Sequence, residues 1–184
     1  MKKTYQINHF QINPSVFVPS KKTLLLKPTD GTRTLLNATR DVCSWIDRPT
    51  FKVLDLNHPS RETQETEVRM LRQRRPATLL ELVASLRREP EVLALTQHQI
   101  LLFLETHSSV VPLHSRGTIF LLMPQQGYSK GRLCVVRADK VIQGLYTNPP
   151  EIWLYFGALD SETVWGDSGH NPPLRFVVPT ARWS

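Results

Sequence analysis

The chain has 184 residues, 40% of them hydrophobic and 21% charged, which is the composition of a globular protein. A chain of this length suggests one domain, with or without a small appendage, that can bury a core without help from disulfides or metals. These values exclude a disordered, collagen-like or disulfide-rich protein, and 23 Lys and Arg against 16 Asp and Glu give a net charge of +7.

The basic charge and the aromatic residues lie in different halves of the chain. Residues 1–92 hold 16 Lys and Arg against 10 acids, whereas residues 93–184 hold 7 against 6. Ten of the aromatic residues lie in the second half and five in the first. We predict an extended, β-leaning N-terminal segment over residues 1–58 and an α+β domain over residues 59–184.

Prolines interrupt the first 58 residues and leave short β-leaning stretches between them. The pair Asp30-Gly31 lies between two leucine-rich stretches and predicts a hairpin turn. The whole segment suits an arm that crosses the rest of the chain. The stretches expected to be extended are residues 5–12, 16–18, 23–27 and 51–56.

Helices are expected over residues 60–107. We expect a first helix from Ser60 to about Arg74, because Ser60 suits an N-cap and the residue before Pro76 avoids the α region. In this helix Glu65 is one turn before Arg69, the favoured order for an i,i+4 ion pair.

Capping boxes mark the starts of the second and third helices. Thr78 with Glu81 predicts the second, and Thr96 with Gln99 predicts the third. Phe103 lies on the apolar face of the third helix, so we expect it to be buried against a sheet.

From residue 118 onward the hydrophobic period changes to two, which predicts strands joined by short turns. Short connections favour antiparallel neighbours. The predicted fold class is therefore α+β, with a C-terminal antiparallel β-meander packed on the third helix. The sheet spans residues 118–178, with strands over 118–123, 132–137, 141–146, 152–157 and 174–178 and a turn at 138–140.

Clustered arginines in and after the first two predicted helices are the main candidate binding feature. Clustered Lys and Arg neutralise phosphates and release counterions, which favours nucleic acid as a partner. A solvated helix face with its own ion pairs is the competing interpretation. The candidate phosphate-binding residues are Arg69, Arg72, Arg74, Arg75, Arg87, Arg88, Lys21 and Lys22.

These arginines make a non-enzymatic nucleic-acid-associated accessory or regulatory protein the first hypothesis. The alternative is a protein–protein interaction module, such as an inhibitor, immunity or scaffold subunit, with no nucleic-acid role. Trp153 and Tyr155 share one face of a predicted strand, where they can pack under the N-terminal segment, stack on bases or contact a partner protein.

Residues 162–170 carry the weak indications of an enzyme. Gly166-Asp167-Ser168-Gly169 resembles the nucleophile loop of trypsin-like serine proteases, but His170-Asn171 follow where that loop has Gly-Pro. Glu162, Asp167 and His170 are types that bind divalent metals, at a spacing typical of ordinary loops. A hydrolase is thus the third hypothesis, and we predict no catalytic residue, metal, cofactor or small-molecule substrate.

Two features bear on the compartment. Met1-Lys2-Lys3 is followed by polar residues rather than the apolar stretch of a secretory signal, and no apolar run could span a bilayer. Cys43 and Cys134 lie in apolar contexts that predict buried free thiols rather than a disulfide. We expect a cytoplasmic protein that does not contact membranes.

Overall fold

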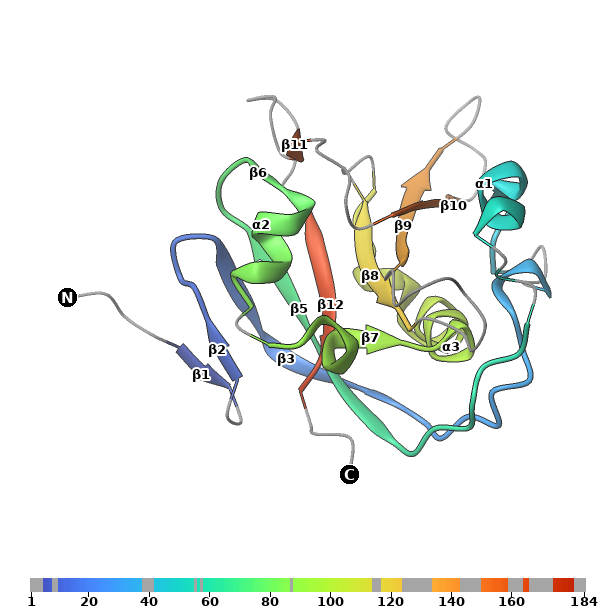
Figure 1. The fold of residues 1–184 in the computed structure, drawn as a ribbon, viewed down its shortest axis with the longest axis horizontal. Helices are drawn as coiled ribbons and strands as arrows, with labels where there is room; N and C mark the ends of the chain where they lie inside the picture. Colours follow the sequence, from blue (N-terminus) through green and yellow to red (C-terminus); the bar gives the residue numbers. More distant parts are fainter. Residues whose placement is uncertain are drawn as a thin grey trace.

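The fold is α+β, as expected, and is built on one mixed sheet (Figure 1). A computed structural model describes residues 5–7, 10–37, 42–54, 56, 58–86, 88–113, 117–123, 134–142, 150–158, 164–165 and 174–180. The strands are β1 (Tyr5–Ile7), β2 (Phe10–Ile12), β3 (Phe17–Leu26), β4 (Trp45–Ile46), β5 (Thr66–Gln73), β6 (Ala77–Thr78), β7 (Ala94–Leu95), β8 (Thr118–Leu122), β9 (Cys134–Val141), β10 (Glu151–Ala158), β11 (Val164–Trp165) and β12 (Arg175–Pro179). The helices are α1 (Arg48–Val53), α2 (Leu79–Ala84) and α3 (Gln97–His107), with 3-10 turns η1 (Leu35–Asn37), η2 (Pro90–Leu93) and η3 (Ser108–Val110).

The large sheet has the strand order β3-β5-β12-β8-β9-β10-β4, and β7 also pairs with β8. Strands β8, β9 and β10 are successive antiparallel neighbours. β12 does not follow β10 across the sheet. It lies between β5 and β8, antiparallel to the first and parallel to the second.

Each face of this sheet carries its own hydrophobic core. Helix α3 and helix α1 cover one face, where Phe103 and Phe51 join a core cluster with Phe120 and Val177. Helix α2 covers the other face, where Leu82 packs in a second cluster. Figure 1 shows α2 and α3 on opposite sides of β12. We call these the α3 face and the α2 face.

Both predicted capping boxes are confirmed. Thr78 accepts a hydrogen bond from the backbone N–H of Glu81, whose side chain accepts one from the Thr78 N–H. Thr96 and Gln99 make the same reciprocal pair at the start of α3. These bonds satisfy N–H groups that a helix start leaves without partners, so local sequence alone fixes where both helices begin.

The predicted first helix over residues 60–74 is wrong, because residues 66–73 form β5. Thr66, Val68 and Met70 alternate with more exposed residues along this strand. β5 forms ladders with β3 on one side and β12 on the other. Two ladders and this burial outweigh a Glu65–Arg69 helical pair, which contributes only about 0.2–0.5 kcal/mol.

The predicted hairpin at Asp30-Gly31 is also wrong. β3 pairs with β5 instead, and the leucines after the turn form η1. Gly31 has a φ of +74°, and its carbonyl accepts a 2.9 Å hydrogen bond from the Ser60 N–H. The turn therefore docks on residues 58–63 rather than returning along its own strand.

Two smaller predictions fail for equally local reasons. Residues 51–56 were expected to be extended, but α1 begins at Arg48, with Asp47 as N-cap and Pro49 in its first turn, where a missing N–H costs nothing. The turn expected at 138–140 lies inside β9, which pairs with β10 without interruption from Cys134 to Val141. Residues 143–146 of the predicted strand 141–146 lie outside the described residues.

Contacts cross the predicted boundary at residue 58. β3 and β4, which precede it, belong to the same sheet as β5 and β10, which follow it. The buried Gln97 side chain accepts a 2.8 Å bond from the Leu35 N–H and donates one of 2.9 Å to the Leu56 carbonyl.

Among the described residues, no helix is both long and apolar enough to cross a bilayer.

We expect the packing of α3 to contribute more stability than its cap. Phe103 is fully buried, with its ring centroid 5.2 Å from that of Phe120. Phe103→Ala should lower the free energy of unfolding by about 3–5 kcal/mol. Thr96→Ala, which removes only a cap, should lower it by about 0.5–2 kcal/mol. Urea denaturation of the two variants tests this order, and a costlier Thr96→Ala would contradict it.

The two cysteines should be unreactive in the folded protein. Both are free and buried, and burial raises the pKa of each thiol to about 11. Because the thiolate is the reactive form, Ellman's reagent at pH 8 should label neither residue in the native state. Both should react once the protein is unfolded in urea. Rapid labelling of either in native buffer would show that it is exposed.

Candidate anion-binding surface

Strand β3 at the edge of the sheet contains a bulge that brings lysines to the surface. Pro19 pairs with Leu71 and Thr23 with Arg69, so Ser20, Lys21 and Lys22 lie opposite Met70 alone. The Ser20 hydroxyl donates a 2.8 Å hydrogen bond to the Lys22 carbonyl within this bulge. Both lysines are exposed.

Arg72 and Arg175 lie directly opposite each other on the adjacent strands β5 and β12. Directly paired residues of antiparallel strands share a face, with Cβ atoms about 4.5–5.5 Å apart. Arg175 donates a 3.0 Å hydrogen bond from Nη1 to the Val110 carbonyl. Arg72 is exposed and makes no hydrogen bond or ion pair with the described residues.

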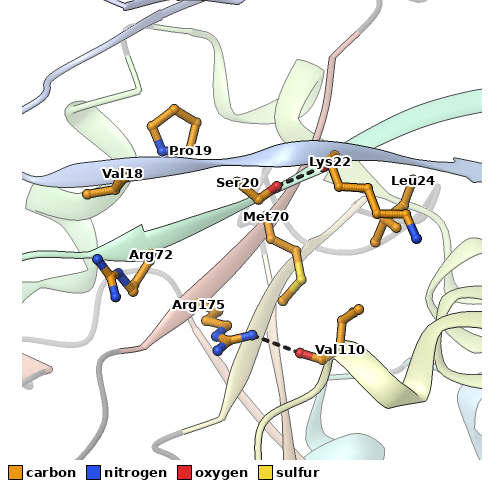
Figure 2. Close-up of a pocket in the computed structure, with 9 residues that line it drawn as sticks. All are labelled: Val18, Pro19, Ser20, Lys22, Leu24, Met70, Arg72, Val110 and Arg175. Atoms are coloured by element: carbon orange, nitrogen blue, oxygen red, sulfur yellow. Dashed lines mark hydrogen bonds between the residues drawn. The ribbon is translucent and has the colours of Figure 1, made fainter.

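The two arginines line a pocket on the α3 face, beside η3. Its volume is about 340 Å³. Figure 2 shows Met70, Arg72 and Arg175 pointing to the same side of the sheet, with Val110 of η3 beyond them. The nine lining residues, which define the β3–β5–β12 pocket, are Val18, Pro19, Ser20, Lys22, Leu24, Met70, Arg72, Val110 and Arg175.

The three strands that line this pocket carry one acid, Glu67, which is the second residue of β5. Residues 13–29, 68–80 and 174–180 contain eight Lys and Arg and no Asp or Glu. Arg74 and Arg75 follow β5 and are exposed, and the Arg74 N–H bonds to the Val16 carbonyl beside the start of β3. We call the exposed cations of this strand pair, Lys21, Lys22, Arg72, Arg74 and Arg75, the basic edge.

The structure brings together some of the predicted cations and separates others. Arg69 is part-buried, on the face opposite the pocket, and donates a 2.9 Å bond to the Thr23 hydroxyl. Arg88 is also part-buried and follows α2, the helix of the opposite face. Arg87 lies outside the described residues. The basic edge thus keeps five of the eight predicted residues, on strands rather than on a helix.

Arg175 was missed by sequence reasoning. It is isolated from other cations in the sequence, and only the pairing of β12 with β5 brings it beside Arg72. The low acid content of these segments was visible in the sequence. Their spatial convergence required the strand register.

A second feature is an aromatic cluster on the α2 face, at the far end of the sheet. The Trp45 ring lies 5.7 Å from that of Trp153 and 5.1 Å from that of Tyr155, and the Arg137 guanidinium lies 4.4 Å above Tyr155. Trp45 is 41% exposed. Burial raises the pKa of Asp139, which the Arg137 guanidinium 3.0 Å away partly opposes.

Of residues 162–170, on which the hydrolase hypothesis depended, the structure describes only Val164 and Trp165. Glu162, Asp167, Ser168 and His170 all lie outside the described residues. In the part of the chain that is described, no three His, Cys, Asp or Glu side chains come close enough to hold a metal ion.

Comparison of the chain with protein-family models, curated proteins and solved structures finds no match. Any inference about a ligand therefore rests on the charge and shape of the surface described above.

The opposed arginines should cost stability when no anion is bound, because like charges directly opposite each other repel. Arg72→Gln should raise the free energy of unfolding by up to about 1 kcal/mol in low salt. The gain should shrink in 0.5 M NaCl, where screening weakens the repulsion. Urea denaturation at the two salt concentrations measures this, with Arg74→Gln as the control. A loss of stability in Arg72→Gln that is independent of salt would contradict repulsion.

Proposed function

We propose that the protein is a non-enzymatic, nucleic-acid-associated accessory protein whose basic edge contacts phosphates. The observation that carries this proposal is that five exposed cations lie on β3, on β5 and directly after β5, whereas these two strands carry one acid, Glu67. Exposed Lys and Arg supply the sequence-independent part of nucleic-acid affinity. Such contacts position the strand without reading its bases.

Protection of the sheet edge accounts for only part of this charge. Lysines, a proline and a bulge on an edge strand prevent pairing with other chains, and β3 has all three. Arg72 lies on β5, which is paired on both sides and needs no such protection. Arg74 and Arg75 follow the same strand, so a bound ligand explains the charge of these three arginines better than edge protection does.

We propose that the protein is cytoplasmic, because both of its cysteines are free thiols, as is usual in a reducing environment.

The test is the salt dependence of binding to fluorescein-labelled single-stranded and duplex oligonucleotides, measured by anisotropy. Log affinity should fall linearly with log salt, by about 0.9 per phosphate neutralised on duplex DNA and about 0.7 on single strands. Arg74→Gln with Arg75→Gln should flatten the slope by up to about two such contacts, equally for unrelated sequences.

The matched control is Arg48→Gln with Lys52→Gln, which removes the same charge. Both residues are exposed on α1, which packs beside β10 at the opposite end of the sheet. Equal weakening by the two double variants would show that net charge, not the basic edge, binds nucleic acid. Failure of the wild type to bind at 100 mM salt would refute the proposal.

The aromatic cluster favours a second candidate function, a protein–protein interaction module. Trp, Tyr and Arg are enriched at interface centres, and Trp45, Tyr155 and Arg137 lie together on the sheet. A partner that co-purifies with the wild type should be lost from Trp45→Ala, whereas nucleic-acid binding should not change. Retention of the partner by this variant would place the interface elsewhere.

A further inference from the structure

We propose that the β3–β5–β12 pocket binds a small apolar organic anion, with its carboxylate or phosphate head near Arg72 and Arg175. This site overlaps the basic edge at Lys22 and Arg72, and it differs from the edge by the addition of Arg175 and of apolar walls. The sequence alone gave no indication of such a ligand.

The charges of the pocket specify the head of the ligand. Three of its nine lining residues are cations and none is an acid. Arg72 and Arg175 occupy paired positions on adjacent strands, and both side chains line the pocket, so either guanidinium is available to an anion bound there. Arg binds carboxylates and phosphates through paired N–H groups, and each charge-assisted bond is stronger than a neutral one.

The remaining walls specify the body of the ligand. Val18, Pro19, Leu24, Met70 and Val110 present aliphatic or thioether surface. The Ser20 hydroxyl and the Val110 carbonyl already have partners in Lys22 and Arg175. A nucleobase needs donors and acceptors at its edges, which these walls do not offer, so an aliphatic or simple aromatic body fits better. The volume of about 340 Å³ is at the lower end of ligand pockets.

The position of the arginines in the sheet supports a ligand over a structural explanation. Neither β5 nor β12 is an edge strand, so their charges do not serve to protect an edge. The only partner that the described residues give to either guanidinium is the Val110 carbonyl, which carries no charge. A bound anion would compensate the two charges, which otherwise repel each other across the ladder.

The experiment uses decanoate as the probe, titrated below 1 mM into the full chain by calorimetry. Decanol, which has the body without the charge, and inorganic phosphate, which has the charge without the body, are titrated in parallel. We expect one decanoate per chain, bound at least tenfold more tightly than either control compound. Arg175→Gln and Arg72→Gln should each weaken decanoate binding at least tenfold.

Two further variants separate the pocket from the basic edge. Ser20→Trp should fill the cavity and abolish decanoate binding while leaving every cation in place. Arg74→Gln, outside the pocket, should leave decanoate binding unchanged. Near-ultraviolet circular dichroism of each variant checks that the fold is intact.

Three results would overturn the proposal. The first is no decanoate binding to the wild type, and the second is binding that survives both Arg175→Gln and Arg72→Gln. The third is phosphate bound as tightly as decanoate, which would make these cations an extension of the basic edge. Nucleic-acid binding that persists in Ser20→Trp after decanoate is lost would show two separable sites, so either proposal can fail alone.

Discussion

β12 lies between β5 and β8, and in the described part of the chain it is the strand that joins the two halves of the large sheet. Its antiparallel ladder with β5 and its parallel ladder with β8 meet at Arg175, Phe176 and Val177. Phe176 packs into the core of the α2 face and Val177 into that of the α3 face. One short strand therefore supports both cores, and the same register places Arg175 opposite Arg72. The pocket is a direct consequence of the pairing that completes the fold.

The features that sequence predicted well are those set by neighbouring residues. A capping box needs two residues three positions apart, and both boxes are present where Thr78 and Thr96 indicated them. The alternation of β10 likewise identified a strand from its own residues. The helix prediction for the region before residue 76 failed because the local preferences for helix and strand there are weak and opposed. Glu65 and Arg69 favour a helix, whereas Thr66, Val68 and Met70 alternate as a strand, and distant ladders decide between them.

The sequence identified most of the cations of the candidate site but not their positions relative to one another. Lys21, Lys22 and Arg72 were recognised as cations, but a helix would have presented Arg72 with different neighbours. The bulge that puts three residues opposite Met70 is visible only in the register of β3 against β5. Arg175 lies on β12, about a hundred residues after Arg72 in the sequence. Each of these steps depends on nonlocal pairing, for which a single sequence offers no direct signal.

The arrangement of charges distinguishes solubility from binding. A basic protein that needs only solubility can scatter its cations over exposed positions and pair them with acids, as Arg33 does with Glu105. The basic edge and the pocket do neither. Arg72 and Arg175 occupy paired positions on interior strands, in a pocket whose lining is mostly apolar and contains no carboxylate. A protein retains an unfavourable local arrangement where function benefits from it. An anion that brings its own negative charge turns the repulsion between these arginines into two attractions, and for this reason the pocket is the part of the fold most dependent on a ligand.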